Sequence, residues 1–137
     1  MITITIPGEM RGKGRPRFSV RGGHARAYTD AKTANAETWI KACAVAQAGL
    51  KPLDTAVSLD MAITVEVPAS WSRKKREKAL AGEIWPTGKP DIDNSCKLVA
   101  DALNGIVWKD DKQIVRLVAS KRYGEVAQTV LVVSDAC

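Results

Sequence analysis

The twelve residues AVSLDMAITVEV, at positions 56–67, constrain the fold more than any other part of the chain. Apolar and polar side chains alternate along this segment, which is typical of a β-strand with one buried face. Pro68 ends the strand, and residues 2–6, ITITI, show the same alternation near the N-terminus. Strands of this kind need a second layer on their apolar side, so the sequence predicts a sheet with one covered face.

The first helix that could supply this layer is predicted to run from about residue 30 to residue 48. Thr29 or Asp30 is a suitable N-terminal cap, and Gly49 is a suitable stop. Trp39 and Cys43 recur at helical spacing within this segment. We expect both of them to be core residues.

Two further helices and two further strands are predicted downstream. The second helix, RKKREKALAG at 73–82, follows a cap at Ser70 or Ser72, and the third runs from about 94 to 104 and ends at Gly105. Strands are expected from about 113 and over 126–134. The predicted fold is one α+β domain over residues 1–137, with a small mixed sheet of about four strands flanked by about three helices. The third helix should bury Leu98, Val99, Ala102 and Leu103.

The composition limits where the protein works and which chemistry it can use. No apolar run is long enough to span a bilayer, and the N-terminus lacks the features of a signal peptide, so we expect a soluble cytoplasmic protein without a membrane partner. The three cysteines are widely spaced and form no CxxC motif, which argues against a zinc site or a disulfide framework. With His24 as the single histidine, carboxylates would have to carry any metal.

The charge distribution favours a nucleic-acid partner. The net charge is +6, but residues 91–111 hold five aspartates and two lysines, which leaves 19 basic and 10 acidic residues, a net +9, in the rest of the chain. Between residues 11 and 26 there are five arginines, one lysine and no acid, and four cations crowd the first turn of the second predicted helix, where they oppose its dipole. Solvated basic surfaces remain the alternative. The predicted DNA contacts are Arg11, Lys13, Arg15, Arg17, Arg73, Lys74, Lys75, Arg76 and Lys89.

The acidic island begins with KPDIDNSCK, at 89–97. Pro90 biases the preceding residue toward extended chain, so Asp91 and Asp93 are expected to point the same way and to converge on a cation such as Mg²⁺. Asp93 is also a natural helix cap, and capping alone could explain it, whereas it would not explain Asp91.

Asp93, Lys97 and Asp101 follow at a spacing of four residues and should line one helix face. Helix salt bridges are one explanation of this stripe, and a lysine beside a scissile phosphate is the other. Asp110 and Asp111, in WKDD, join the site if the chain folds back after the helix, and otherwise make a soluble turn. Packed carboxylates should have raised pKa values in the absence of metal.

The run KPDIDNSCKLVADALNGIVWKDDKQIV resembles the signature of RusA-type Holliday junction resolvases, and GKGRPRF and SWSRKKREKAL also resemble phage members of that family. The resemblance implies a homodimeric endodeoxyribonuclease of DNA recombination and repair, encoded by a phage or prophage. Such an enzyme uses Mg²⁺, with Mn²⁺ able to substitute, to cut two symmetric phosphodiesters of a four-way DNA junction.

Residue by residue, the resemblance implies catalytic roles for Asp91, Asp93, Lys97 and Asp111. Asp91, Asp93 and Asp111 would also bind metal, with Asp110 as a further acidic ligand and Asp101 without an assigned role. One departure is Ser95, where relatives often carry leucine, and this bears on the packing of the first helical turn.

Two other classes of function stay open at this point. One is a non-catalytic nucleic-acid-binding module whose aspartates only cap a helix and form salt bridges. The other is a metal-dependent phosphatase or nucleotidyl hydrolase, although a small substrate would not need the large basic surface.

Overall fold

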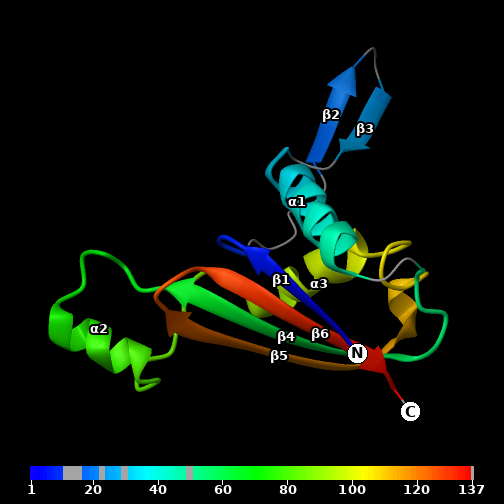
Figure 1. Ribbon diagram of the computed structural model, residues 1–137. Helices are drawn as coiled ribbons and strands as arrows, with labels where there is room; N and C mark the ends of the chain where they lie inside the picture. The colour runs from blue at the N-terminus through cyan, green and yellow to red at the C-terminus, as the bar shows by residue number, and fades with distance from the viewer. Residues whose placement is uncertain (11–16, 22–23, 29–30, 49–50, 137) are drawn as a thin grey trace.

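The computed structural model describes residues 1–10, 17–21, 24–28, 31–48 and 51–136 of the chain. Its centre is a four-stranded sheet made by β1 (Ile2–Pro7), β4 (Val57–Glu66), β5 (Ile114–Gly124) and β6 (Gln128–Asp135). The strand order is β1-β6-β4-β5, and β4 and β5 are parallel while the other pairs are antiparallel (Figure 1). The mixed sheet confirms the four strands expected from the sequence.

In the part of the chain that the structure describes, three helices accompany the sheet: α1 (Ala31–Gln47), α2 (Arg73–Leu80) and α3 (Ile92–Ala102). α1 packs against β1 and α3, and α3 also contacts β5. The segments β2 (Arg17–Arg21) and β3 (His24–Tyr28) pair as an antiparallel hairpin outside the main sheet. The predicted α+β class is confirmed, while the predicted caps Thr29 and Asp30 and the predicted stop Gly49 lie outside the described residues.

The core lies between one face of the sheet and the helices α1 and α3. Val57, Leu59, Met61 and Ile63 alternate into it from β4, as the pattern of that segment predicts. Cys43 is buried, as expected, but the prediction of a core position for Trp39 is wrong. Trp39 is 50% exposed, because it lies at the edge of the buried face of α1, where its indole N–H donates to the carbonyl of Pro7 at 2.8 Å.

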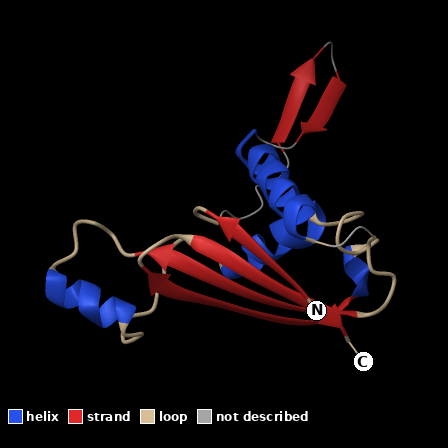
Figure 2. Cartoon of the chain, viewed as in Figure 1, coloured by secondary structure: helices blue, strands red, loops and turns tan. Residues whose placement is uncertain are grey.

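The connection between β4 and β5, residues 67–113, contains both α2 and α3. It is long because β4 and β5 are parallel neighbours, so the chain must return to the end of the sheet from which β4 started. α2 lies beyond the end of the sheet where β4 finishes, and α3 lies along the sheet (Figures 1 and 2). None of the helices in the described part of the chain is long and apolar enough to cross a membrane.

Candidate active site

The acidic stretch opens α3, but the helix begins earlier than the sequence predicts. Asp91, in extended conformation at φ −74° and ψ 125°, is the N-terminal cap, and its Oδ1 accepts a hydrogen bond from the Asp93 backbone N–H at 3.2 Å. Asp93 is therefore a residue of the first turn, and the predictions that Asp93 caps the helix and lies on extended chain are wrong. The helix starts here because Ile92 packs against the core and the Ser95 N–H already bonds to the Asp91 carbonyl.

Asp93, Lys97 and Asp101 do share one face of α3, because all three lie within its bounds at a spacing of four residues. The pKa of Asp93 is lowered, first by hydrogen bonding with the Asp91 side chain and also by the backbone of Asn94 and the charge of Lys97. The opposite face carries the predicted apolar residues Leu98, Val99 and Ala102, all buried, and the departure Ser95 is buried as well.

Trp108 returns the chain to α3 after the helix ends. Its side chain is fully buried, and its indole N–H donates to the Ala100 carbonyl at 3.2 Å and to the Asn104 side chain at 3.0 Å. Gly105 makes the reversal at φ +78°, a backbone conformation that favours glycine. The WKDD segment is thereby packed against the end of α3, and its return to the start of the helix, where Asp91 and Asp93 lie, stays a prediction.

Asp110 and Asp111, which we call the acidic turn, are held by a capping box. Asp110 caps a 3₁₀ turn (Asp111–Gln113), accepting from the Lys112 N–H at 2.9 Å, while the Gln113 side chain accepts from the Asp110 N–H at 2.8 Å. The Gln113 amide also donates to the carbonyls of Leu53 and Thr55, at 2.8 and 2.9 Å. Gln113 therefore fixes the acidic turn to the segment before β4.

The pKa values of the two carboxyl groups of the acidic turn are shifted in opposite directions. The pKa of Asp110 is lowered, chiefly by the backbone N–H of Lys112. The pKa of Asp111 is raised by hydrogen bonding with the Asp110 carboxyl, by burial, and by the charge and hydrogen bonding of Asp101. The expectation that the packed carboxylates all have raised pKa values is confirmed for Asp111 and wrong for Asp93 and Asp110, because donor groups next to those two stabilise the charged form.

These contacts place acidic groups at both ends of α3. Asp91 and Asp93, which we call the acidic pair, lie at its start, whereas Asp111 meets the helix at Asp101, near its end. Asp101 comes eight positions after Asp93, a rise of about 12 Å along the helix axis, with Lys97 midway. Among the residues that the structure describes, no three His, Cys, Asp or Glu side chains form a group that could hold a metal ion. The ligand set of the acidic pair with the acidic turn stays a prediction.

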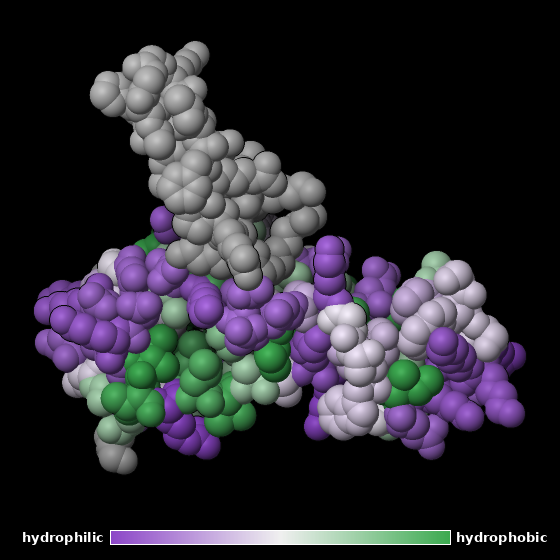
Figure 3. All heavy atoms as spheres, turned by 180° about the vertical axis from the view of Figure 1, so that it is seen from behind, coloured by the Kyte–Doolittle hydropathy of each residue, from purple (hydrophilic) through white to green (hydrophobic). Residues whose placement is uncertain are grey.

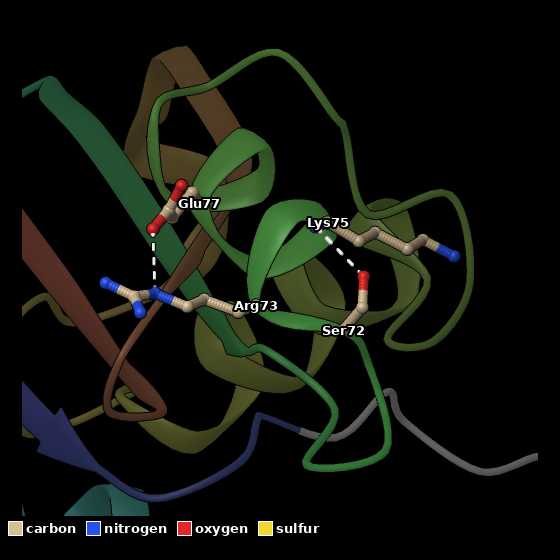
Figure 4. A network of polar contacts seen from close by, with 4 residues as sticks. All are labelled: Ser72, Arg73, Lys75 and Glu77. Carbon is tan, nitrogen blue, oxygen red and sulfur yellow. Dashed lines mark hydrogen bonds and ion pairs between the residues drawn. The ribbon is translucent and has the colours of Figure 1, made fainter.

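The basic residues of α2 lie apart from these carboxylates. Ser72 caps the helix, as predicted, and accepts from the Lys75 N–H at 3.2 Å, while Arg73 pairs with Glu77 at 3.3 Å (Figure 4). Lys75 Nζ lies 3.9 Å from the centre of the Trp71 ring. Seen from behind, the end of the molecule that α2 occupies is largely hydrophilic (Figure 3). The cluster of Arg73, Lys74, Lys75 and Arg76 is thus presented to solvent, with Arg76 half-buried.

The structure describes the remaining predicted DNA contacts only in part. Lys89 is exposed next to the acidic pair, where it precedes Pro90 through a cis peptide bond. Arg17 opens β2. Arg11, Lys13 and Arg15 lie outside the described residues.

Three features of this region are not indicated by the sequence. Trp85 is 57% exposed, with the Arg122 guanidinium 5.8 Å from its ring centre. It lies in a loop with prolines and a glycine. The side chains of Gln113 and Lys121 donate hydrogen bonds to backbone carbonyls far away in the sequence, and no local sequence pattern predicts such bonds.

Comparisons with known proteins agree with the sequence resemblance. A family model described as endodeoxyribonuclease RusA matches residues 7–134. A Bacillus subtilis (strain 168) protein named "Uncharacterized protein YqaN" is 39% identical over 126 residues, which cover 90% of this chain and 89% of that protein. Both matches include the acidic pair, Lys97 and the acidic turn.

Proposed function

Because the chain belongs to the RusA endodeoxyribonuclease family, we propose that it resolves four-way DNA junctions by paired, symmetric, Mg²⁺-dependent phosphodiester cleavage in recombination and repair. The observation that carries the proposal is the arrangement on α3, where two adjacent carboxylates open the helix and Lys97 follows one turn later on the same face. One carboxylate is sufficient to cap the helix, so capping does not account for the second carboxylate or for the lysine. We assign both of them to catalysis.

The donor atoms suit Mg²⁺, which takes oxygen ligands and is commonly bound by one or two carboxylates together with water and substrate phosphate. Asp91 and Asp93 would hold it, with Asp111 and Asp110 as further ligands, and Mn²⁺ would substitute. When bound, the ion supplies charge neutralisation and activation of water. Lys97, exposed on the same helix face, would donate to the scissile phosphate as negative charge develops there.

A homodimer would bring two such sites to a two-fold junction. β5 is an edge strand of the sheet, and Val115, Leu117 and Val118 on it are between 47% and 63% exposed. An exposed apolar edge strand pairs readily with another strand, so we propose β5 as the surface for the second copy. Val118→Lys should shift the protein toward the monomer in light scattering. An unchanged mass, dimeric or monomeric, would count against this surface.

DNA would be held by its phosphates through α2, Lys89 and the predicted contacts Arg11, Lys13, Arg15 and Arg17. The alternative, a binding module without catalysis, is favoured by one observation: Asp91 has a structural role as the cap of α3.

Asp91→Asn separates the two functions, because asparagine caps helices as well as aspartate does. The wild type should cleave a synthetic four-way junction with Mg²⁺, in preference to linear duplex and fork, and fail without the ion. The variant should lose about a thousandfold or more of the cleavage rate while keeping its melting temperature and its junction affinity. Glu125→Gln, an equal charge change at an exposed residue outside the site, should cleave normally. Undiminished cleavage by Asp91→Asn would leave the binding module as the better account.

A further inference from the structure

Lys121 connects the second half of β5 to the loop that precedes the acidic pair. Its Nζ donates to the carbonyl oxygens of Gly88 and Pro90, at 2.8 Å in each case. Hydrogen bonds from a charged donor are roughly twice as strong as neutral ones. Two of the three donor positions of the ammonium group are therefore used on the backbone of this loop.

The hydrogen bond to the Pro90 carbonyl affects the orientation of Asp91. It belongs to the same planar peptide unit as the backbone nitrogen of Asp91, so orienting this carbonyl orients the plane from which Asp91 departs. Asp91 in turn caps α3 and bonds to the Asp93 N–H. A displacement of Lys121 would therefore turn the rigid peptide that precedes Asp91, and with it both members of the acidic pair would move.

The loop itself has no regular secondary structure, all of its residues lying in the described part of the chain. Within the described part of the chain, residues 84–90 make no backbone–backbone hydrogen bond. Pro86 and Pro90 are buried, and Trp85 is 57% exposed with the Arg122 guanidinium 5.8 Å from its ring centre. The neighbouring residues Lys121 and Arg122 therefore tether the loop at two points, and Lys121 makes the closer contacts.

β5 also carries the other end of the site, because Ile114, its first residue, follows directly after the 3₁₀ turn of the acidic turn. α3 runs back along β5, since its start lies near Lys121 and its end meets Asp111. One strand therefore sets where both acidic groups lie.

We propose that Lys121 is a positioning residue for the cleavage reaction, which holds the acidic pair in register with β5 without contacting DNA or metal. This inference rests on the proposed nuclease function. It predicts that the ammonium group affects the rate of the chemical step and leaves junction binding unchanged.

The test compares Lys121→Met, Lys121→Arg and a control, Lys41→Met, which removes an equal charge from an exposed residue of α1 that belongs neither to the loop nor to β5. Three quantities are measured: the single-turnover cleavage rate at saturating enzyme, the junction affinity without metal, and hydrogen exchange over residues 84–95. A misplacement of about 1 Å can cost a hundredfold in rate, so Lys121→Met should lose about ten- to a hundredfold. Its junction affinity should match that of Lys41→Met, and exchange should accelerate at the start of α3.

Lys121→Arg keeps a charged donor and should recover most of the rate. An unchanged rate in Lys121→Met, or a loss of rate explained by an equal loss of affinity, would overturn the proposal. The proposal would also be overturned if Lys121→Arg cleaved as slowly as Lys121→Met while residues 84–95 stayed protected from hydrogen exchange. Should Lys121→Met not fold, Lys121→Gln is judged by the same criteria. A wild-type protein that cuts no junction refutes the proposed function, whereas unaltered exchange in the variants refutes the tether.

Discussion

Helices α2 and α3 belong to the same connection between β4 and β5, yet they are built in opposite ways. Of the eight residues of α2, all within the described part of the chain, Ala79 alone is buried, and four cations fill its first half. α3 buries Ser95, Leu98, Val99 and Ala102, and acidic groups meet it at both ends. One helix is a solvated basic surface, and the other is part of the core.

This difference matches what each proposed task requires. Attraction between a cation and a phosphate falls off gradually with distance, so an exposed helix with mobile side chains can hold DNA. Chemistry at one phosphate depends on placement within about half an ångström, so its groups belong on packed elements with bonded supports. Substitutions at α3 and its supports should change rates and stability sharply, and substitutions at α2 should change affinity gradually.

After Asp91, the largest effect is expected at Asp111, where the acidic turn meets α3. Asp111→Asn keeps the size of the side chain but removes a carboxylate that the proposal assigns to catalysis. The cleavage rate should fall about a hundredfold or more, with junction affinity preserved or increased, because negative charge near DNA is removed. Single-turnover cleavage and a binding titration check both parts. Normal cleavage would confine catalysis to the acidic pair and Lys97.

The same variant should be more stable than the wild type at neutral pH. The pKa of Asp111 is raised in the folded state, so ionisation costs stability above that pKa, and the cost disappears once pH falls below the pKa of the unfolded chain. The advantage of Asp111→Asn in urea unfolding should therefore shrink to nothing in acid. Asp110→Asn is the matched control with the opposite sign, because the pKa of Asp110 is lowered. A constant difference between Asp111→Asn and the wild type across pH would contradict this prediction.

A smaller, structural effect is expected at Gln113. Gln113→Leu removes three hydrogen bonds and leaves the carbonyls of Leu53 and Thr55 without this donor, which should lower the free energy of unfolding by about 1–3 kcal/mol. Cleavage should fall as well, since the acidic turn loses its support. Gln128→Leu, at a half-buried glutamine of β6, controls for the gain in apolar surface. Equal stability of the two variants would show that the bonds of Gln113 do not hold the turn.

The smallest effect is expected at α2. Neutralising Lys74 and Arg76 to glutamine should weaken junction binding by about tenfold at low salt and reduce the slope of log affinity against log salt by about one to two. The melting temperature should not change, because neither residue is part of the core. Lys41→Gln with Lys51→Gln removes the same charge from exposed residues elsewhere. Identical salt slopes in the two double variants would remove α2 from the DNA interface.

The sequence predicts those parts of the molecule that depend on local periodicity. The alternation along β4 and the apolar face of α3 both follow from residue spacing, and both are confirmed. The exact start of α3 does not follow from spacing, because Asp91 and Asp93 are both competent caps and the packing of Ile92 decides between them. Lys121 and Gln113 could not be identified either, because their bonds reach backbone carbonyls at least 31 residues away.

The strand order has a consequence for a chain that is cut. A break in the loop after α2, between Ala81 and Ile84, would give one fragment with β1 and β4 and another with β5 and β6. In the sheet these strands alternate, since β6 lies between β1 and β4 while β4 lies between β6 and β5. Each fragment would therefore contribute a strand that lies between two strands of the other. The two fragments of a nicked protein should stay associated until the sheet itself unfolds.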